Sequence, residues 1–155
     1  MKTRVHSNRR IMLILFTMVL IAGTPLAQGS NDESNLDLQE ANVTSVDFEQ
    51  SGGERYRFNV TLIHDDDGES GYANWWQVET LDGEQLGRRE LLHAHGTQEF
   101  TRSETINIPQ GTTEVVVRGH DQTHGYGGQA LIVNVETGDS ERVRQGSEPD
   151  DFTNR

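Results

Sequence analysis

The chain has 155 residues, no cysteine and a formal net charge of −12, from 25 acidic and 13 basic residues. The absence of cysteine excludes disulfides, thiolate metal sites and a lipid-anchored cysteine. No basic patch is present, which argues against nucleic acid and anionic membrane surfaces as partners. We therefore expect a domain that its hydrophobic core alone must stabilise.

The first 27 residues have the pattern of an export signal. Four basic residues precede an apolar run from Ile11 to Gly23, which is too short and too abruptly ended for a comfortable membrane span. Arg9-Arg10 resembles a twin-arginine (Tat) signal, while Asn8 before the pair leaves the Sec route equally open. We predict a signal peptide over 1–27 and a secreted or cell-surface protein whose mature form has no membrane segment. An uncleaved anchor is the alternative.

The charge is more one-sided outside this segment. Four of the basic residues lie in 1–27, so the rest of the chain carries nine arginines, no lysine and all of the acidic residues. Carboxylates stay hydrated, and their repulsion is screened, in a salt-rich medium. We therefore predict a halophilic source. A genome that prefers arginine codons, combined with acidic tails, is the alternative.

Polar stretches flank a central domain. Residues 28–42 and 137–155 lack apolar periodicity, so we expect a disordered linker and a disordered acidic tail. Between them, 43–136 shows short runs of alternating apolar and polar residues, with no internal repeat and no useful helical period. We expect seven strands, over 43–48, 55–63, 74–81, 85–92, 100–108, 114–119 and 130–135.

Turn signals separate these strands. Asp82-Gly83 predicts a two-residue hairpin, and Pro109 begins a tight turn that ends at Gly111. About seven short strands joined in this way predict an all-β fold. We expect an antiparallel two-sheet sandwich of the immunoglobulin or fibronectin-III type, with a small barrel as the alternative.

Strand direction predicts where the histidines lie. If consecutive strands alternate in direction, the loops after 55–63, 85–92 and 114–119 all fall at one end of the sandwich, and the short turns fall at the other. These three loops hold five of the six histidines. Functional loops often gather at one end of a rigid sandwich. A connection that crosses between sheets without reversing direction would break this arrangement.

Imidazoles and a carboxylate gathered at one end point to a divalent-metal or small polar-ligand site. His93 and His95 have the i, i+2 spacing that puts both rings on one face of an extended chain. Such ligands suit zinc or copper better than calcium. The acidic run 65–69 lacks full EF-hand spacing, so a solvated loop is favoured over a calcium site. The candidate metal ligands are His64, His93, His95, His120, Asp121 and His124.

Two other interpretations of the histidines stay open. A histidine beside an aspartate often hydrogen-bonds to the backbone and holds a loop in place. His93 and His95 could also stack on Tyr72, Tyr126 or Phe100. A metal-free organic ligand is the second alternative.

Aromatic residues in the same region offer a different kind of site. By alternation, one of Trp75 and Trp76 faces away from the core, and its ring could stack on a sugar or contact a surface protein. Tyr72 and Tyr126 lie in the same loops. Burial of both tryptophans is the competing interpretation. These four residues are the candidate ligand-binding residues of a carbohydrate-binding or surface-interaction domain.

Catalysis has little support in the sequence. We find no nucleophile elbow, P-loop or dinucleotide fingerprint. We therefore favour a binding module over an enzyme, with a purely structural surface domain as a further alternative. Asn42-Val43-Thr44 and Asn59-Val60-Thr61 are glycosylation sequons, and Asn59 falls on the outward face of its strand.

Overall fold

The computed structural model describes residues 35–66, 68–146, 148 and 152–153. The predicted signal peptide, 1–27, lies outside this part of the chain. Among the described residues, no helix is long and apolar enough to cross a membrane. The strands are β1 (Asn42–Gly52), β2 (Arg55–Ile63), β3 (Ala73–Glu79), β4 (Gln85–Glu90), β5 (Phe100–Asn107), β6 (Glu114–Asp121), β7 (Gly125–Tyr126), β8 (Gln129–Asn134) and β9 (Ser140–Arg144).

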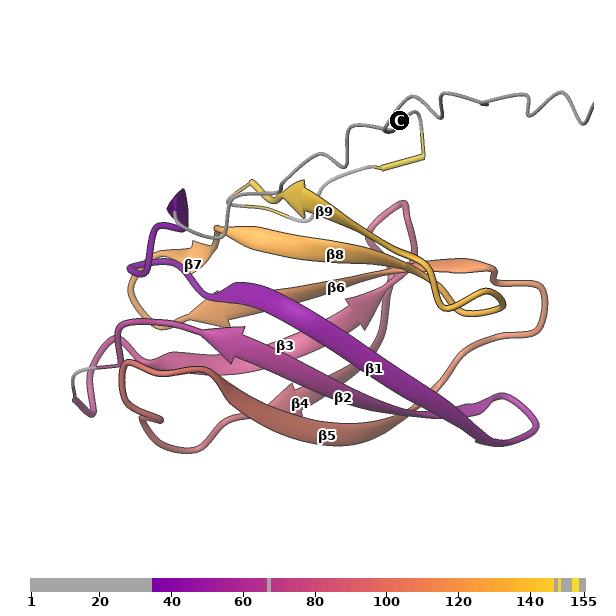
Figure 1. Ribbon diagram of the computed structural model, residues 1–155, viewed down its shortest axis with the longest axis horizontal. Coiled ribbons are helices and arrows are strands. Elements are labelled where there is room, and N and C mark those ends of the chain that lie inside the picture. The colour runs from indigo at the N-terminus through magenta and orange to yellow at the C-terminus, as the bar shows by residue number, and fades with distance from the viewer. Residues whose placement is uncertain (1–34, 67, 147, 149–151, 154–155) are drawn as a thin grey trace, which may run out of the picture. The chain divides into compact units, whose positions relative to one another are not determined.

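The strands form two antiparallel sheets, one packed on the other (Figure 1). The smaller sheet has the order β1-β2-β5. The larger has the order β4-β3-β6-β8-β9, with the short β7 paired to β6. The predicted all-β sandwich is confirmed, with nine strands in the described chain where we expected seven. The fourth strand pairs with the third, as in immunoglobulin-type domains that extend the second sheet.

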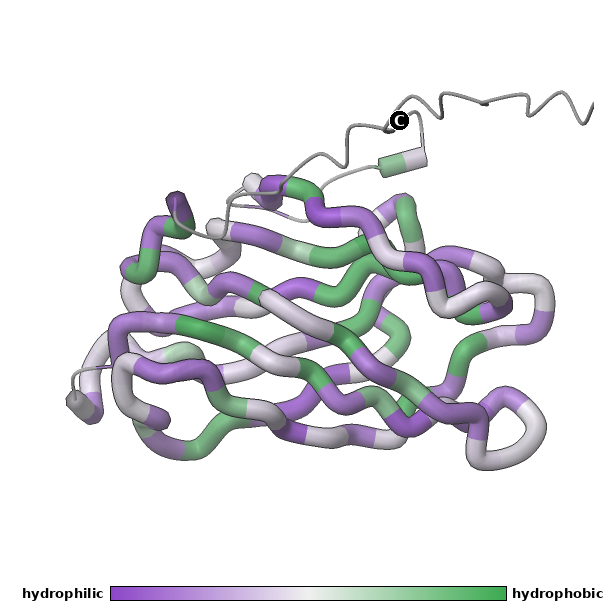
Figure 2. Tube along the Cα trace, viewed as in Figure 1, coloured by the Kyte–Doolittle hydropathy of each residue, from purple (hydrophilic) through white to green (hydrophobic). Residues whose placement is uncertain are grey.

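Alternation of side chains builds the core between the sheets. Phe58, Val60 and Leu62 of β2 are completely buried, as are Trp76 and Val78 of β3. Figure 2 shows apolar and polar residues alternating along the strands of the smaller sheet. Because successive side chains of a strand point to opposite faces, the residues between them lie on the outer faces of the sandwich.

The expected disordered tail from Thr137 is wrong for part of its length. β9 pairs with β8 throughout, from Gln129 opposite Arg144 to Val133 opposite Ser140. The larger sheet also buries apolar residues on its outer face, where Val116, Ala130 and Ile132 form a second cluster with Leu81, Val143 and Phe152. The predicted tail assumed one buried face for these strands, whereas β9 and Phe152 cover apolar residues on the other face.

The expected disordered linker over 28–42 is also wrong at its C-terminal end. Ala41 and Asn42 are fully buried, and Ala41 belongs to the core. The backbone N–H of Asp65 donates to the carbonyl of Leu38 at 2.7 Å. The polar composition of this segment did not predict these contacts. They hold the residues before β1 against the loop that follows β2.

Candidate functional site

Three histidine-bearing loops meet at one end of the sandwich, at the left of Figure 1. β4 and β6 run in the same direction because β3 pairs antiparallel with both, and β2 also ends at this side (Figure 1). A bridge between Asp66 and Gly96 joins the first loop to the second. His64 Nε2 and Asp121 Oδ2, 3.9 Å apart, connect the first loop to the third. The structure therefore places the loops as the strand directions predicted.

Asp66 is the hub between two of these loops. Its carboxylate is buried, and Oδ1 accepts a hydrogen bond from the Ala73 N–H at 2.9 Å. Oδ2 accepts from the His95 N–H at 2.8 Å. Oδ1 also contacts His64 Nδ1. One carboxylate thus fixes the start of β3 and the loop between β4 and β5.

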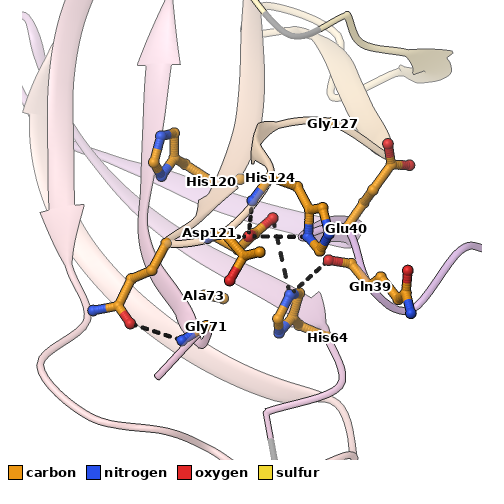
Figure 3. Close-up of polar contacts among 12 residues, drawn as sticks. Gln39, Glu40, His64, Gly71, Ala73, His120, Asp121, His124 and Gly127 are labelled. Carbon is orange, nitrogen blue, oxygen red and sulfur yellow. Dashed lines mark hydrogen bonds and ion pairs between the residues drawn. The ribbon is translucent and has the colours of Figure 1, made fainter. Parts of the chain in front are cut away.

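Asp121 lies at the end of β6 and is completely buried (Figure 3). Its Oδ1 accepts from the backbone N–H groups of Thr123 at 2.8 Å and His124 at 2.6 Å. His124 Nδ1 lies 3.4 Å from the same oxygen. Oδ2 has no hydrogen-bond partner within the described chain, and it faces His64 Nε2. Burial of a carboxylate oxygen without a donor is costly, so a cation or water would be stabilised there.

His64 is held from both sides. Nδ1 contacts the Asp66 carboxylate, and Nε2 lies 3.0 Å from the carbonyl oxygen of Gln39. Both neighbours are acceptors, so each ring nitrogen lies against an oxygen. The His64 side chain is buried between the Asp66 and Asp121 carboxylates.

His93 and His95 stack instead of chelating. The His95 ring lies parallel to Phe100, with centroids 4.0 Å apart, and tilts against His93 at 4.6 Å. His93 is exposed, and its Nδ1 lies 2.9 Å from the Ala94 carbonyl. Burial, helped by Arg102 and His93 and opposed by Asp66, lowers the pKa of His95. The i, i+2 pair does not direct both rings at one point, because the chain bends here into a loop.

His120 lies apart from Asp121, although the two are neighbours in sequence. Successive residues of a strand point to opposite faces, and His120 faces the outer side of the larger sheet. Its ring stacks on Trp75 at 4.0 Å, and Nδ1 lies 2.7 Å from Asn74 Oδ1. Burial lowers the pKa of His120, against the opposing effect of Asp121.

The tryptophans do not form an open platform. Trp76 is completely buried in the core, so its candidacy as a ligand-binding residue is wrong. Trp75 is 7% exposed and is covered by His120 and by the Arg88 guanidinium, 3.8 Å from its ring centre. Tyr72 and Tyr126 are half-buried. Sugar stacking on these two tyrosines stays a prediction.

A buried polar cluster that was not predicted from the sequence lies on the same outer face. Arg118 Nη1 lies 3.3 Å from Glu79 Oε2, and both side chains are at most 1% exposed. Arg118 also donates to Gln145 Oε1 at 2.8 Å and to the Glu148 carbonyl at 3.1 Å, and lies over the Tyr126 ring. Burial, with the nearby Glu79 carboxylate, raises the pKa of Tyr126. Charged residues at alternate positions of a strand predict an exposed face. Here Glu79 and Arg118 are buried, and the C-terminal residues Gln145 and Glu148 contact Arg118.

The predicted metal ligands separate into three places. His64, Asp121 and His124 lie together, His93 and His95 stack at Phe100, and His120 lies against Trp75. Within the part of the chain that the structure describes, no group of three or more metal-ligating side chains has the arrangement of a metal centre. A metal would therefore have to reorganise the first group in order to bind.

One relative is similar over most of the chain. A protein of Halomicrobium mukohataei named "Putative lipoprotein" is 65% identical over 121 residues, which are 78% of this chain and 60% of the relative. The chain thus spans less than two thirds of that protein's length. No family model matches the sequence. No solved structure matches it either.

Proposed function

We propose that this protein is exported and acts at the cell surface as a β-sandwich binding domain. The 65% identity to a protein named as a lipoprotein is the observation that carries the proposal. The basic and apolar pattern of residues 1–27 supports it independently. Because the 155 residues contain no cysteine, the proposal covers export and surface association but no lipid on this chain.

Cell fractionation tests export. We expect the full chain to appear outside the cytoplasm with a mass that lacks an N-terminal segment, and a variant without residues 1–27 to stay inside. Replacing Arg9 and Arg10 by lysine keeps the charge and blocks only the twin-arginine route, so it distinguishes the two export pathways. Full-length, uncleaved chain in the cytoplasm would overturn the proposal.

The charge supports a salt-rich working medium as part of this proposal. Outside residues 1–27 the chain carries 25 carboxylates against nine arginines, and the excess negative charges repel one another at low ionic strength. Salt screens this repulsion, so the melting temperature should rise between low salt and molar KCl. A melting temperature that is unchanged or lower in molar KCl would argue for codon preference as the cause of the composition.

As a second candidate function, we propose that a divalent cation such as Zn²⁺ binds between Asp121, His64 and His124. The unpartnered, buried Oδ2 of Asp121 favours it, since this oxygen lies 3.9 Å from His64 Nε2. Metal-binding histidines are commonly oriented by a carboxylate on their other ring nitrogen, and Asp66 contacts His64 Nδ1 in this way. His64 Nε2 would exchange its contact with the Gln39 carbonyl for the ion.

Zinc retention after equilibrium dialysis tests this second candidate. We expect about one zinc ion per chain, lost in His124→Gln. The His124 side chain is exposed, so this substitution should leave the fold intact. Asp121→Asn should lose it as well. His93→Gln is the matched control, because His93 lies in the stacked group and should leave retention unchanged. A wild-type chain that retains no zinc would remove this candidate and leave the export proposal standing.

A further inference from the structure

We propose that the exported protein carries an N-linked glycan on Asn59, and that the other sequon asparagine, Asn42, stays unmodified. Both residues begin an Asn-x-Thr triplet, so the sequence treats them alike. The structure separates them by burial and by the hydrogen bonds of their side-chain amides. The inference rests on the export proposed above, because sugar is transferred to asparagine on chains that leave the cytoplasm.

The side-chain amide of Asn42 has hydrogen-bond partners for its oxygen and for both of its hydrogens. Its Nδ2 donates to the carbonyl oxygens of Asp37 and Glu40, both at 2.7 Å, so both amide hydrogens have partners. Its Oδ1 accepts from the Gln129 N–H at 2.9 Å. Asn42 is completely buried, and its Oδ1 would lie 2.6 Å from a Cβ built on Gly128. A sugar on Nδ2 would break these contacts and has no space.

The amide of Asn59 is free on one side. Phe58 and Val60 point into the core, so alternation places Asn59 on the outer face of β2, where it is half-buried. Its Oδ1 accepts a hydrogen bond from Ser103 Oγ at 2.7 Å. Its Nδ2, the atom that carries the sugar, donates to no other residue of the described chain.

The surface around Asn59 suits a hydrated sugar. Asp47 and Ser103 flank it on the two neighbouring strands. The other side chains of this face are also short or charged, and all are exposed or half-buried: Ser45, Glu49, Arg57, Thr61, Thr101 and Thr105. The outer face of the larger sheet is the opposite case, since its Glu79 and Arg118 are buried. The smaller sheet thus presents a polar outer face that a glycan can cover without displacing an apolar contact.

The transfer step requires a polyprenyl-phosphate-linked oligosaccharide as donor. A bond forms between Asn59 Nδ2 and the anomeric carbon of the sugar, the bond from that carbon to the phosphate oxygen breaks, and the polyprenyl phosphate leaves. The amide proton passes to a base of the transferase. The fold accepts a glycan on Asn59, which lies on the outer face of β2, and rejects one on the enclosed Asn42, so the folded, exported chain carries sugar on Asn59 alone.

Mass spectrometry of the exported full chain tests the inference. Trypsin cleaves after Arg55 and Arg57, which places the two sequons on different peptides. We expect the peptide that begins at Phe58 to carry the sugar mass and the peptide with Asn42 to have its unmodified mass. Thr61→Ala should abolish the modification, whereas Thr61→Ser keeps the sequon and should preserve it.

The outcomes separate this inference from the export proposal. Exported protein with an unmodified Asn59 peptide would overturn the glycan and leave export intact. Sugar on Asn42 in folded, exported protein would overturn the structural argument. Protein found only in the cytoplasm would contradict the export proposal. In that case the chain is expressed behind a proven export signal to test Asn59 directly. An unmodified Asn59 peptide in that exported protein would overturn the glycan.

Discussion

Asp66 accepts a hydrogen bond from the backbone N–H of His95, 29 residues away, at 2.8 Å. With its second oxygen on the Ala73 N–H, this carboxylate holds two loops that the strands alone do not connect. The histidine-rich end of the sandwich is therefore first of all a polar network that fixes loops, and any ligand must bind to this network as it stands or rearrange it.

Substitution of Asp66 should be costly for this reason. Asp66→Asn keeps the shape but replaces one acceptor oxygen by a donor, which then faces an N–H group. We expect a loss of about 2–4 kcal/mol in the free energy of unfolding, measured by urea denaturation. Asp65→Asn is the control, since the Asp65 side chain is exposed and should change stability by less than about 0.5 kcal/mol. Equal effects of the two substitutions would contradict the assignment of Asp66 as the hub.

Stability should fall with acidification. The pKa of His95 is lowered from 6.5, chiefly by burial, and that of His120 is lowered in the same way. The unfolded chain therefore binds protons near pH 6.5, whereas the folded chain binds them only at lower pH. Between these values the unfolded state holds more protons, so the stabilisation is complete above pH 6.5 and decreases as the pH falls.

Two measurements check this pH dependence. The ring proton of His95 should titrate below pH 6.5 in the folded protein and near that value in urea. His95→Gln should flatten the decrease in unfolding free energy between neutral pH and pH 5. A His95 midpoint at or above its urea value would show that burial does not control this group.

Arg118 should be the most costly arginine to remove. Arg118→Ala leaves the buried Glu79 carboxylate without its cation and the Gln145 side chain without its donor. We expect a loss of about 3–5 kcal/mol, together with faster hydrogen exchange in β9. Arg89→Ala removes a partly exposed pair with Glu104 at 3.5 Å and should cost less than about 1 kcal/mol. A mild effect at Arg118 would mean that the C-terminal residues do not depend on it.

Gly119 should not tolerate a side chain. A Cβ at this position would lie 2.8 Å from the Ala41 carbonyl oxygen and 3.0 Å from Leu62. Backbone cannot move aside as a flexible side chain can, so Gly119→Ala should lower the melting temperature and cost about 1–3 kcal/mol. Gly68→Ala meets nothing within 4 Å and is the matched control. Unchanged stability at Gly119 would show that residues before β1 pack more loosely than described.

The fold was largely predictable, and the site only in part. Alternation located β2 to the residue and the other core strands to within a few residues, because a period of two is imposed by burial of one face. Strand direction placed His64, His95 and Asp121 at one end. Sequence spacing could not show that His95 would stack on Phe100, because that orientation depends on a loop bend. The opposite orientation of His120 and Asp121 was missed because the predicted strand ended at 119, whereas β6 continues to Asp121.

The two-sheet architecture and the end at which the histidine loops gather could be read from local periodicity and strand count, and the excess of acidic residues from composition. Long-range packing determines which of two identical sequons is buried, which carboxylates lie out of reach of water, and that residues near the C-terminus cover a second buried face. Each of these depends on contacts between residues far apart in the chain, such as Asn42 with Gln129 and Arg118 with Gln145, and no local pattern encodes them.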